Sequence, residues 1–463
     1  MRLHNCPKPV MARSCKIAVL LTAFFFCVSH SRAQIITTIA GGNCIPGMPS
    51  GDGGPATSAF FGAGPTCFDG KGNMYICDDV HNSIRKINAI TGIISTIAGL
   101  DSPGYNGDNI PAVSAKLFYP YGIAVDNIGN VIFSDHGNSR IRKIDASTGV
   151  ITTIAGNGID NFSGDNGLAI NAQVYRVSDV KIDKHGNIYL CDFGNQRVRK
   201  IGINDTITTI AGGGPDAPPL DGDGGLATNA YLLFPTGICF DSAENLFISC
   251  GSGREKIRKV NTSGIISTIA GNGTQGYNGE GIATQSWFLS PTSIMADKRG
   301  NVFVADGGNN RVRIITPDGY IATYVDTAGN HGSGFSGDNG WAGAAFIQSL
   351  QAMSIDDQDN LYLSTACRIR KVTPPPVGIS LLRSKDEIRI FPNPASDYLQ
   401  VQFKRQFTGS ISIYNTTGQL LQKEDLTKSL EYHLAISAFP PGLYFLKIRS
   451  PKGPSYSRNF TKQ

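Results

Sequence analysis

The sequence has few long apolar runs, and this scarcity limits what the protein can be. Its longest apolar run, Ile17 to Val28, has twelve residues, whereas a membrane-spanning helix needs about 20. Four Lys and Arg residues precede this run, and Ser31-Arg32-Ala33 follows it as a small-x-small cleavage site. The pattern predicts a secretory signal peptide over 1–33 and no membrane span elsewhere.

Charge is also scarce, since Asp, Glu, Lys and Arg make up only 17% of the chain. Residues 1–33 hold five Lys and Arg and no Asp or Glu, so the expected mature chain has 36 basic and 36 acidic residues. A chain without net charge offers no strong basic surface to nucleic acid or to anionic lipid. We therefore expect neither of them as a partner.

The third scarcity concerns motifs with known chemistry. No Cys-x-x-Cys pair, His-Glu-x-x-His sequence or Gly-rich phosphate loop occurs, so we expect no cofactor and no metal. Seven cysteines follow residue 33. Several of them, including Cys67 and Cys239, fall where the repeat described below has Ala or Ser, so we expect buried thiols. A Cys239–Cys250 disulfide is the open alternative.

What the sequence does contain is a repeat. Residues 120–156 read PYGIAVDNIGNVIFSDHGNSRIRKIDASTGVITTIAG, with four short apolar runs bounded by Gly, Asn or Asp. Four strands joined by tight turns form an antiparallel meander, which is too small to be stable unless it stacks on its neighbours. The first-strand motif occurs six times, as PTCFD (65–69), PYGIAVD (120–126), VSDVKID (177–183), PTGICFD (235–241), PTSIMAD (291–297) and AMSID (352–356).

Only five copies of the fourth strand follow these motifs, ending with a weaker one at Tyr324. The missing copy is IITTIAG at 35–41, near the start of the expected mature chain. An N-terminal strand that completes the last blade is what a closed ring requires. The sequence therefore predicts an all-β protein in which 34–373 form a six-bladed β-propeller closed by its N-terminal strand.

The turns carry two further patterns. An Asp-x-x-x-Asn turn joins the first and second strands, where Asp and Asn suit hairpin chemistry. Asp-x-x-Asn-x-Arg-(Ile/Val)-Arg joins the second and third, as at Asp135/Asn138/Arg140, and we expect an Asp–Arg pair to clamp this hairpin. With these residues the chain resembles the NHL-repeat family. The resemblance implies a propeller and leaves function open, because that family includes binding proteins and enzymes.

Long connections of about twenty residues lead from each fourth strand to the next first strand. They share sequences such as GDGGPATSA (51–59) and GDNGLAINA (164–172). Repeats with this type of connection resemble the NHL domains of bacterial secreted proteins and of the extracellular teneurins. We expect each Ala pair to form one helical turn capped by the Asp. Asp221 and Asp223 suit a calcium loop, but the distal Glu ligand is absent.

These connections and the second-to-third-strand turns emerge on one face of a propeller, here called the long-loop face. Long loops favour function, and aromatic side chains favour recognition. The expected binding residues on this face are Tyr105, Phe162, Tyr277, Phe335, Trp341, His136 and His331. Pinning of the loops is the alternative role for the aromatic residues.

An enzyme is the alternative reading of the propeller. Some six-bladed relatives of the resembled family are metal-dependent lyases or lactonases with a site in the central channel. His81, His136 and His331 are the candidate zinc ligands here. They lie in turns and loops without a shared spacing, so we expect no catalytic residues and no enzyme activity.

The chain changes character after the propeller. TPPPVG (373–378) predicts a stiff linker at 374–378, and 379–463 read as a small Ig-like β-sandwich. Phe391-Pro392-Asn393-Pro394, Pro441-Gly442-Leu443-Tyr444 and the ending Phe460-Thr461-Lys462-Gln463 resemble the C-terminal sorting domain of type IX secretion in the Bacteroidetes.

This second resemblance implies export to the cell surface, contact with the type IX machinery and removal of 379–463 by a sortase-like surface protease. An adhesive Ig-like module is the alternative. Together the patterns predict a secreted or cell-surface module in which the propeller binds an extracellular protein or glycan. A metal-dependent lyase or lactonase-like enzyme is the second hypothesis.

Overall fold

The computed structural model describes residues 34–42, 51–214, 221–251, 253–326, 335–374, 388–391, 395–415, 419–449 and 455–462. The predicted signal peptide and nearly all of the predicted linker lie outside these ranges. The regular elements within them are β-strands and short 3₁₀ turns. None of the described helices has the length and apolarity to cross a membrane.

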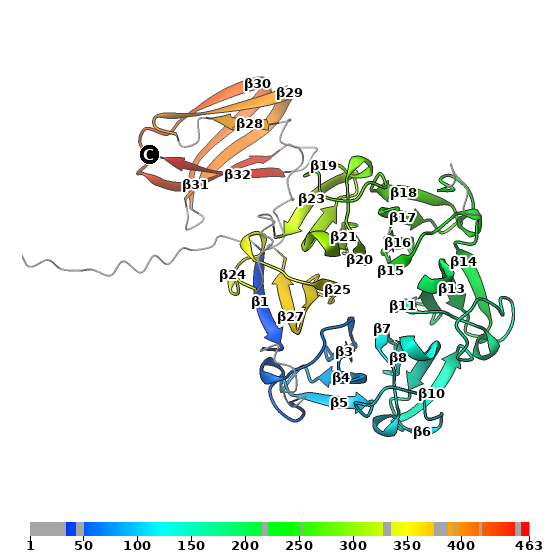
Figure 1. The fold of residues 1–463 in the computed structure, drawn as a ribbon. Helices are drawn as coiled ribbons and strands as arrows, with labels where there is room; N and C mark the ends of the chain where they lie inside the picture. The colour runs from blue at the N-terminus through cyan, green and yellow to red at the C-terminus, as the bar shows by residue number, and fades with distance from the viewer. Residues whose placement is uncertain are drawn as a thin grey trace, which may run out of the picture.

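Six antiparallel sheets stand around a common centre, as the all-β prediction requires (Figure 1). Blade 1 contains β2 (Thr66–Phe68), β3 (Met74–Asp78), β4 (Ser83–Ile87) and β5 (Ile94–Ala98). Blade 2 contains β7 (Pro120–Val125), β8 (Val131–Asp135), β9 (Arg140–Ile144) and β10 (Val150–Ala155). Blade 3 contains β11 (Val177–Ile182), β12 (Ile188–Asp192), β13 (Arg197–Ile201) and β14 (Ile207–Ala211).

The second half of the ring repeats this order of four strands. Blade 4 contains β15 (Pro235–Phe240), β16 (Leu246–Cys250), β17 (Lys256–Val260) and β18 (Ile266–Ala270). Blade 5 contains β20 (Pro291–Ala296), β21 (Val302–Asp306), β22 (Arg311–Ile315) and β23 (Tyr320–Val325). Blade 6 contains β25 (Leu350–Ile355), β26 (Leu361–Thr365) and β27 (Arg368–Thr373), with β1 (Ile35–Ala40) as its fourth strand.

The N-terminal strand closes the ring, as the sequence predicted. β1 runs antiparallel to β27, with Ile36 opposite Val372 and Ala40 opposite Ile369. Ile36 is fully buried in an apolar cluster that spans blades 5 and 6, whereas Ile35 on the other side of the strand is exposed. The first and last segments of the propeller therefore share one sheet and one core.

A fully buried arginine lies in the third strand of every blade: Arg85, Arg142, Arg199, Arg258, Arg313 and Arg370. Arg199 donates to the carbonyl oxygens of Gln173 and Ser163 at 2.7 and 2.9 Å. Its guanidinium also lies 2.7 Å from Asp165 and 3.6 Å from Asp192. Burial of Asp192 raises the pKa of its carboxyl to about 6. The arginine thus ties the long connection to the blade.

The expected Asp–Arg pair is present with a different arginine, and the predicted Asp cap was wrong. In Asp-x-x-Asn-x-Arg-(Ile/Val)-Arg, the arginine that pairs with the Asp is the second one, because its side chain points into the blade. The Ala pairs do form single 3₁₀ turns, such as η1 (Ala56–Ser58) and η4 (Ala169–Asn171), but without a side-chain cap. The Asp binds the buried arginine and a fourth-strand N–H instead, as Asp165 does with Thr209.

The predicted hairpin turns are confirmed. Asp69 Oδ1 accepts the N–H groups of Lys71 and Asn73, and Oδ2 accepts the Asn73 amide. Gly72 takes the left-handed conformation that the turn requires, at φ 81°. Equivalent bonds recur at Asp126, Asp183, Asp241, Asp297 and Asp356. The ring of aspartates therefore serves the turns.

Five cysteines are free thiols, as expected: Cys67, Cys77, Cys191, Cys239 and Cys250. The alternative Cys239–Cys250 disulfide is therefore excluded. Cys367, which directly precedes β27, is disulfide-bonded.

The C-terminal part forms a separate five-stranded sheet, drawn in orange and red in Figure 1. Its strands are β28 (Ile388–Phe391), β29 (Tyr398–Tyr414), β30 (Leu420–Ala435), β31 (Gly442–Arg449) and β32 (Ser455–Lys462). Its own apolar cluster includes Leu399, Ile411 and Phe460. This part thus has the core of an independent β domain, as predicted.

Candidate functional site

Four of the predicted binding residues occupy equivalent positions on the long connections. The rings of Tyr105, Phe162, Tyr277 and Phe335 each stack on the first arginine of a third strand, and the ring centroids lie 3.8 to 4.0 Å from the guanidinium carbons. The second arginine lies 4.8 to 5.6 Å away. A contact repeated in blades 2, 3, 5 and 6 favours the pinning role, because it serves what those blades share.

The other three predicted residues do not join them. Trp341 lies in β24 (Gly340–Trp341), which pairs with β1 at the outer edge of blade 6. Its ring crosses Gly343, where a Cβ would meet it at 2.4 Å. His331 lies outside the described residues. His136 begins η3 (His136–Asn138) at the centre of the long-loop face.

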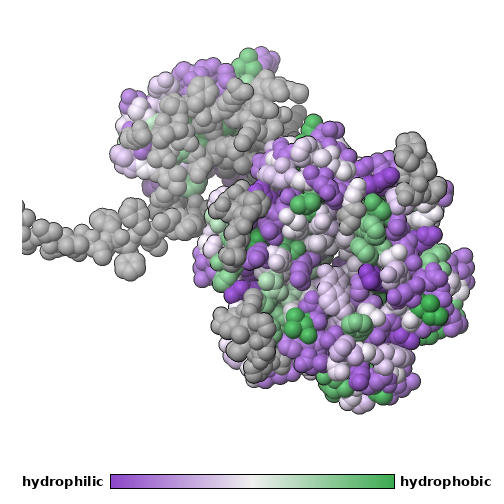
Figure 2. All heavy atoms as spheres, in the orientation of Figure 1, coloured by the Kyte–Doolittle hydropathy of each residue, from purple (hydrophilic) through white to green (hydrophobic). Residues whose placement is uncertain are grey.

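Figure 2 shows hydrophilic residues over most of the visible propeller, with hydrophobic residues in small separate patches. Cavities are therefore better site candidates on this face than a broad apolar surface. First strands of the blades line the central channel, and each end of the channel opens into a cavity.

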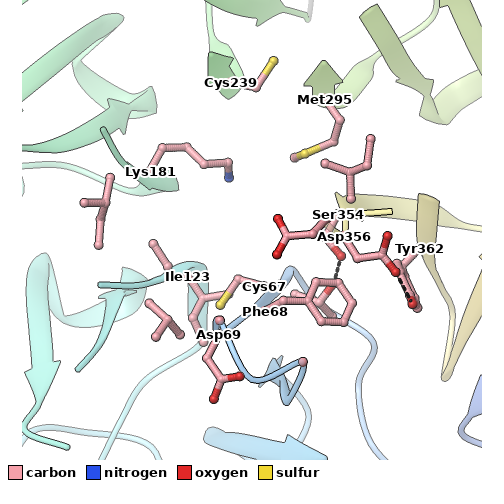
Figure 3. Close-up of a pocket in the computed structure, with 18 of the residues that line it drawn as sticks. Cys67, Phe68, Asp69, Ile123, Lys181, Cys239, Met295, Ser354, Asp356 and Tyr362 are labelled. Atoms are coloured by element: carbon pink, nitrogen blue, oxygen red, sulfur yellow. Dashed lines mark hydrogen bonds between the residues drawn. The ribbon is translucent and has the colours of Figure 1, made fainter. Parts of the chain in front are cut away.

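The larger cavity, of about 840 Å³, opens on the face of the short turns (Figure 3). One residue of each first strand points into it at the same register: Cys67, Ala124, Lys181, Cys239, Met295 and Ser354. Lys181 extends toward the centre of the channel in Figure 3. Its ammonium group lies 2.5 Å from the buried Asp179 carboxylate, so the pair is electrically neutral.

Internal hydrogen bonds occupy several polar groups in and beside this larger cavity. Asp356 accepts the Tyr362 hydroxyl at 2.9 Å and also caps its own turn. The hydroxyls of Thr66 and Ser354 bind one another at 2.6 Å. Asp179 Oδ2 accepts the Ile238 N–H of the next blade. These interactions explain the residues as parts of the fold, so the cavity's size alone does not make it the better candidate.

The smaller cavity, of about 260 Å³, opens on the long-loop face. Tyr119, Tyr121, His136, Arg176 and Phe193 line one side of it, and we call them the crescent. The rings of Tyr119 and Tyr121 lie 7° from parallel with centroids 6.1 Å apart. Both tyrosines also contact the His136 ring, with centroids 5.8 and 6.0 Å away.

The crescent exists because the blades differ at this mouth. Immediately after the second strand, the six blades carry Asp79, His136, Phe193, Gly251, Gly307 and Ala366. Immediately before the first strand, blades 2 to 6 carry Tyr119, Arg176, Phe234, Ser290 and Ser349. Large side chains thus crowd the mouth from blade 2 to the entry of blade 4, where the Phe234 ring lies 5.1 Å from that of Phe193, and small residues leave blades 5 and 6 open.

Backbone geometry also marks this rim. The five residues before the first strands all have left-handed φ angles, from 42° at Phe234 to 53° at Tyr119 and Ser349. This conformation is rare for bulky residues and occurs preferentially at functional sites. This conformation changes the direction of the chain at each of these residues, where the long connection enters the first strand.

The electrostatics of the crescent are set by burial. His136 has Nδ1 3.1 Å from the Val177 carbonyl oxygen, and burial lowers the pKa of its imidazole despite this bond. Burial, reinforced by the Asp78 charge, raises the pKa of Asp79, whose carboxylate accepts the Tyr119 hydroxyl. Arg176 is exposed at the mouth. The crescent therefore combines aromatic faces, a neutral imidazole and one guanidinium.

Sequence reasoning found only His136 among these residues. Tyr121 lies inside a first-strand motif and Phe193 inside an Asp-x-x-Asn turn, while Tyr119 and Arg176 directly precede first-strand motifs, and none of the four was singled out. A comparison of the six copies position by position would have found them, because Phe-Tyr-Pro-Tyr and Tyr-Arg-Val-Ser stand where other copies read Phe-Pro-Thr or Ser-Pro-Thr.

The hypothesis of a metal-dependent site was tested on the side chains present. His81 Nδ1 binds Asp78 at 2.8 Å in blade 1, and the Nδ1 of His136 faces a carbonyl oxygen in blade 2. Across the described ranges, no three His, Cys, Asp or Glu side chains come together to hold a metal ion. His81 and His136 thus have separate protein partners, and His331, the third candidate ligand, lies outside the described residues.

Residues 389–463 match the family described as secretion system C-terminal sorting domain. This match supports the predicted sorting role over an adhesive module. The protein is exported by type IX secretion to the cell surface or outside the cell, and its C-terminal domain interacts with that secretion machinery.

The propeller is similar to parts of much larger proteins. Teneurin-1 of Gallus gallus is 25% identical over 290 residues, which cover 56% of this chain and 11% of teneurin-1. Teneurin-4 of Homo sapiens is 23% identical over 333 residues, which cover 65% of this chain and 12% of teneurin-4. The chain thus spans about a tenth of these relatives, so their activities do not transfer to it.

Solved structures support the fold alone. An auxiliary nutrient binding protein from Bacteroides ovatus has a TM-score of 0.53 and 13% identity, covering 74% of this chain and 77% of that one. A protein of the same description from Bacteroides thetaiotaomicron has a TM-score of 0.52 and 16% identity, covering 73% and 76%. Residues 61–333, more than half of the chain, match the SMP-30/gluconolactonase/LRE-like region, and the protein therefore belongs to this propeller family.

Proposed function

We propose that the propeller is an extracellular binding module of the NHL type whose ligand, part of a glycan or protein, sits at the long-loop mouth of the channel. The observation that carries this proposal is the crescent. Residues that maintain the fold repeat in every blade, whereas the crescent is confined to blades 2 and 3 and leaves its rings facing a cavity. Concave aromatic pockets with a few polar groups are typical ligand sites.

Replacing crescent residues by their own counterparts in other blades should remove binding without unfolding the protein. Phe193 corresponds to Gly307, so Phe193→Gly installs a residue that this turn already accepts in blade 5. We expect the variant to lose at least about tenfold in affinity, since an aromatic anchor contributes 1–2 kcal/mol or more. The measurement is a screen of the purified protein against glycans and surface proteins, followed by calorimetric titration of the hits.

The control for this experiment lies outside the crescent. The sequence predicts Tyr277 and Trp341 as contact residues. The same titration therefore measures Tyr277→Ala and Trp341→Ala. A tenfold loss in these two variants with full binding by Phe193→Gly would move the site to the outer loops. Full binding by all three variants would reject the long-loop face altogether.

An enzyme is the second candidate, because the matching family includes gluconolactonases in its description. Such an enzyme would use the central channel. Hydrolysis of a panel of sugar lactones, measured with and without a chelator, tests it. Lactone hydrolysis that the chelator abolishes would favour an enzyme over the binding proposal. No hydrolysis of any lactone in the panel would support the binding proposal.

We also infer that a sortase-like surface protease removes the predicted domain 379–463 after export. The support is the sorting domain itself, which follows a compact propeller. The intact mass of the protein recovered from the cell surface or medium should correspond to a chain that starts after residue 33 and ends within the 374–378 linker. A mass that includes 379–463 would contradict the cleavage.

A further inference from the structure

The hydroxyl groups of Ser178 and Thr236 in the long-loop cavity already donate their hydrogens within the protein, so toward a ligand they accept. Ser178 donates to the Pro235 carbonyl oxygen at 3.1 Å, and Thr236 donates to that of Pro291 at 2.6 Å. Each hydroxyl has one hydrogen, and here it bridges to the next blade. The oxygen lone pairs that remain suit ligand groups that donate.

His136 presents the same chemistry. A carbonyl oxygen only accepts, so the contact from Nδ1 to Val177 O places the imidazole hydrogen on Nδ1. Burial lowers the pKa of the ring and favours its neutral form. Nε2 therefore carries a lone pair, and the cavity gains a third acceptor.

Arg176, in contrast to these acceptors, supplies hydrogen-bond donors. Its guanidinium lies 5.3 Å from the Tyr175 ring centroid, and the side chain is exposed where it lines the cavity. The nearby acids have partners, since Asp79 accepts from Tyr119 and Asp160 from Ser139. A guanidinium favours a carboxylate or phosphate that binds it bidentately.

The rings of the crescent provide flat apolar faces beside these polar groups. An aromatic face carries a negative quadrupole, which attracts the weakly positive C–H groups on one face of a pyranose. The cavity, at about 260 Å³, is smaller than the ~300–1,000 Å³ of drug-sized sites. It therefore suits a single compact ring better than a peptide, whose backbone would need acceptors and donors along an extended line.

We infer that the long-loop mouth recognises a carboxylate-bearing sugar, as in the uronic acid units of an acidic polysaccharide. The carboxylate binds Arg176, the sugar hydroxyls donate to His136 Nε2 and to Ser178 and Thr236, and the ring lies on the crescent. This inference rests on the proposed function, because it names the ligand class of the same site.

The test compares two forms of one ligand. Oligogalacturonate hexamers and their methyl esters share the sugar chain and differ in the charge of the carboxyl group and in its added methyl, and oligoguluronate hexamers extend the test to another uronate. Calorimetric titration of the full-length protein should show acid hexamers binding at least tenfold more tightly than the esters. The difference should shrink as salt rises, because exposed charge pairs are screened.

Arg176→Gln should lower the affinity for the acid hexamers at least tenfold, to that of the esters, and so abolish the preference for the acid form. Arg299→Gln, an exposed arginine in a short turn on the opposite face, is the matched control and should keep the preference. Circular dichroism and thermal melting show whether both variants fold.

Three results would overturn the inference: esters that bind as tightly as acids, an acid preference that survives Arg176→Gln, or a poly-glutamate peptide that binds more tightly than the uronates through Arg176. If uronates fail but another glycan or protein binds and depends on Phe193, the ligand class is wrong and the proposed function stands. If no probe in the screen binds, the proposed function fails as well.

Discussion

Ile36→Asp should prevent the propeller from folding or reduce its stability by at least about 5 kcal/mol. The side chain is fully buried between blades 5 and 6, and a carboxylate there loses both apolar burial and its own hydration. Because β1 closes the ring, the loss should appear as a lower melting temperature of the whole propeller.

The matched control is the neighbouring residue. Ile35 is 40% exposed, so Ile35→Asp should change stability by less than about 1 kcal/mol. If Ile36→Asp gives no soluble protein, Ile36→Ala should still lose roughly 2–5 kcal/mol. Deletion of 34–41 should be at least as harmful. Melting curves unchanged by these substitutions or by the deletion would show that ring closure does not depend on β1.

Arg199→Met should be the second most harmful substitution, with a loss of roughly 3–5 kcal/mol. The variant keeps the apolar stem but removes the Arg199 donor from the Asp165 carboxylate and from two carbonyl oxygens. It also removes the cation beside the buried Asp192 carboxylate, which keeps its bonds from the Tyr175 N–H and the Asn195 amide. Removal of one partner from a buried ion pair usually costs this much. We expect a melting temperature lower by roughly 5–10 °C.

The stability lost in Arg199→Met should depend on pH. Asp192 has a folded pKa of about 6, above the ~3.9 of an unfolded chain, so its charge reduces stability as the pH rises through this window. Without Arg199 the folded pKa rises further, so the variant should be less impaired at pH 5 than at pH 8.

Arg197→Met is the control for the pair. Arg197 is half-buried and stacks on Phe162, so its loss should cost about 1 kcal/mol at either pH. Equal losses in the two variants would contradict the structural role assigned to the second arginine of each blade.

Much of this fold could be predicted because repetition reveals it. Six first-strand motifs and five internal fourth strands left one strand unaccounted for, and IITTIAG supplied it. The turns followed from Asp, Gly and Asn chemistry alone. Local rules failed where a side chain had two possible partners: Asp165 could cap a helical turn, but a buried Arg199 is a stronger partner than a free N–H.

The candidate site was harder to predict for a related reason. Tyr105 and Phe162 drew attention as aromatic residues near long loops, yet the structure places both against arginines. The residues of the crescent come from two separate stretches of each blade and meet only when the ring closes. Their gathering in blades 2 and 3 becomes visible only when the six copies are compared in space.

The affinity of Gly251→Phe tests most directly the claim that a ligand occupies the long-loop mouth beside the crescent. A Cβ at Gly251 would meet Pro291 and Thr236 at ordinary contact distances of 3.6 to 3.7 Å, and Thr236 lines the cavity. The added ring should fill the mouth without disturbing the blade. Titration with the ligand selected by the screen should show at least a tenfold loss of affinity with an unchanged melting temperature. Wild-type affinity in this variant would contradict the claim.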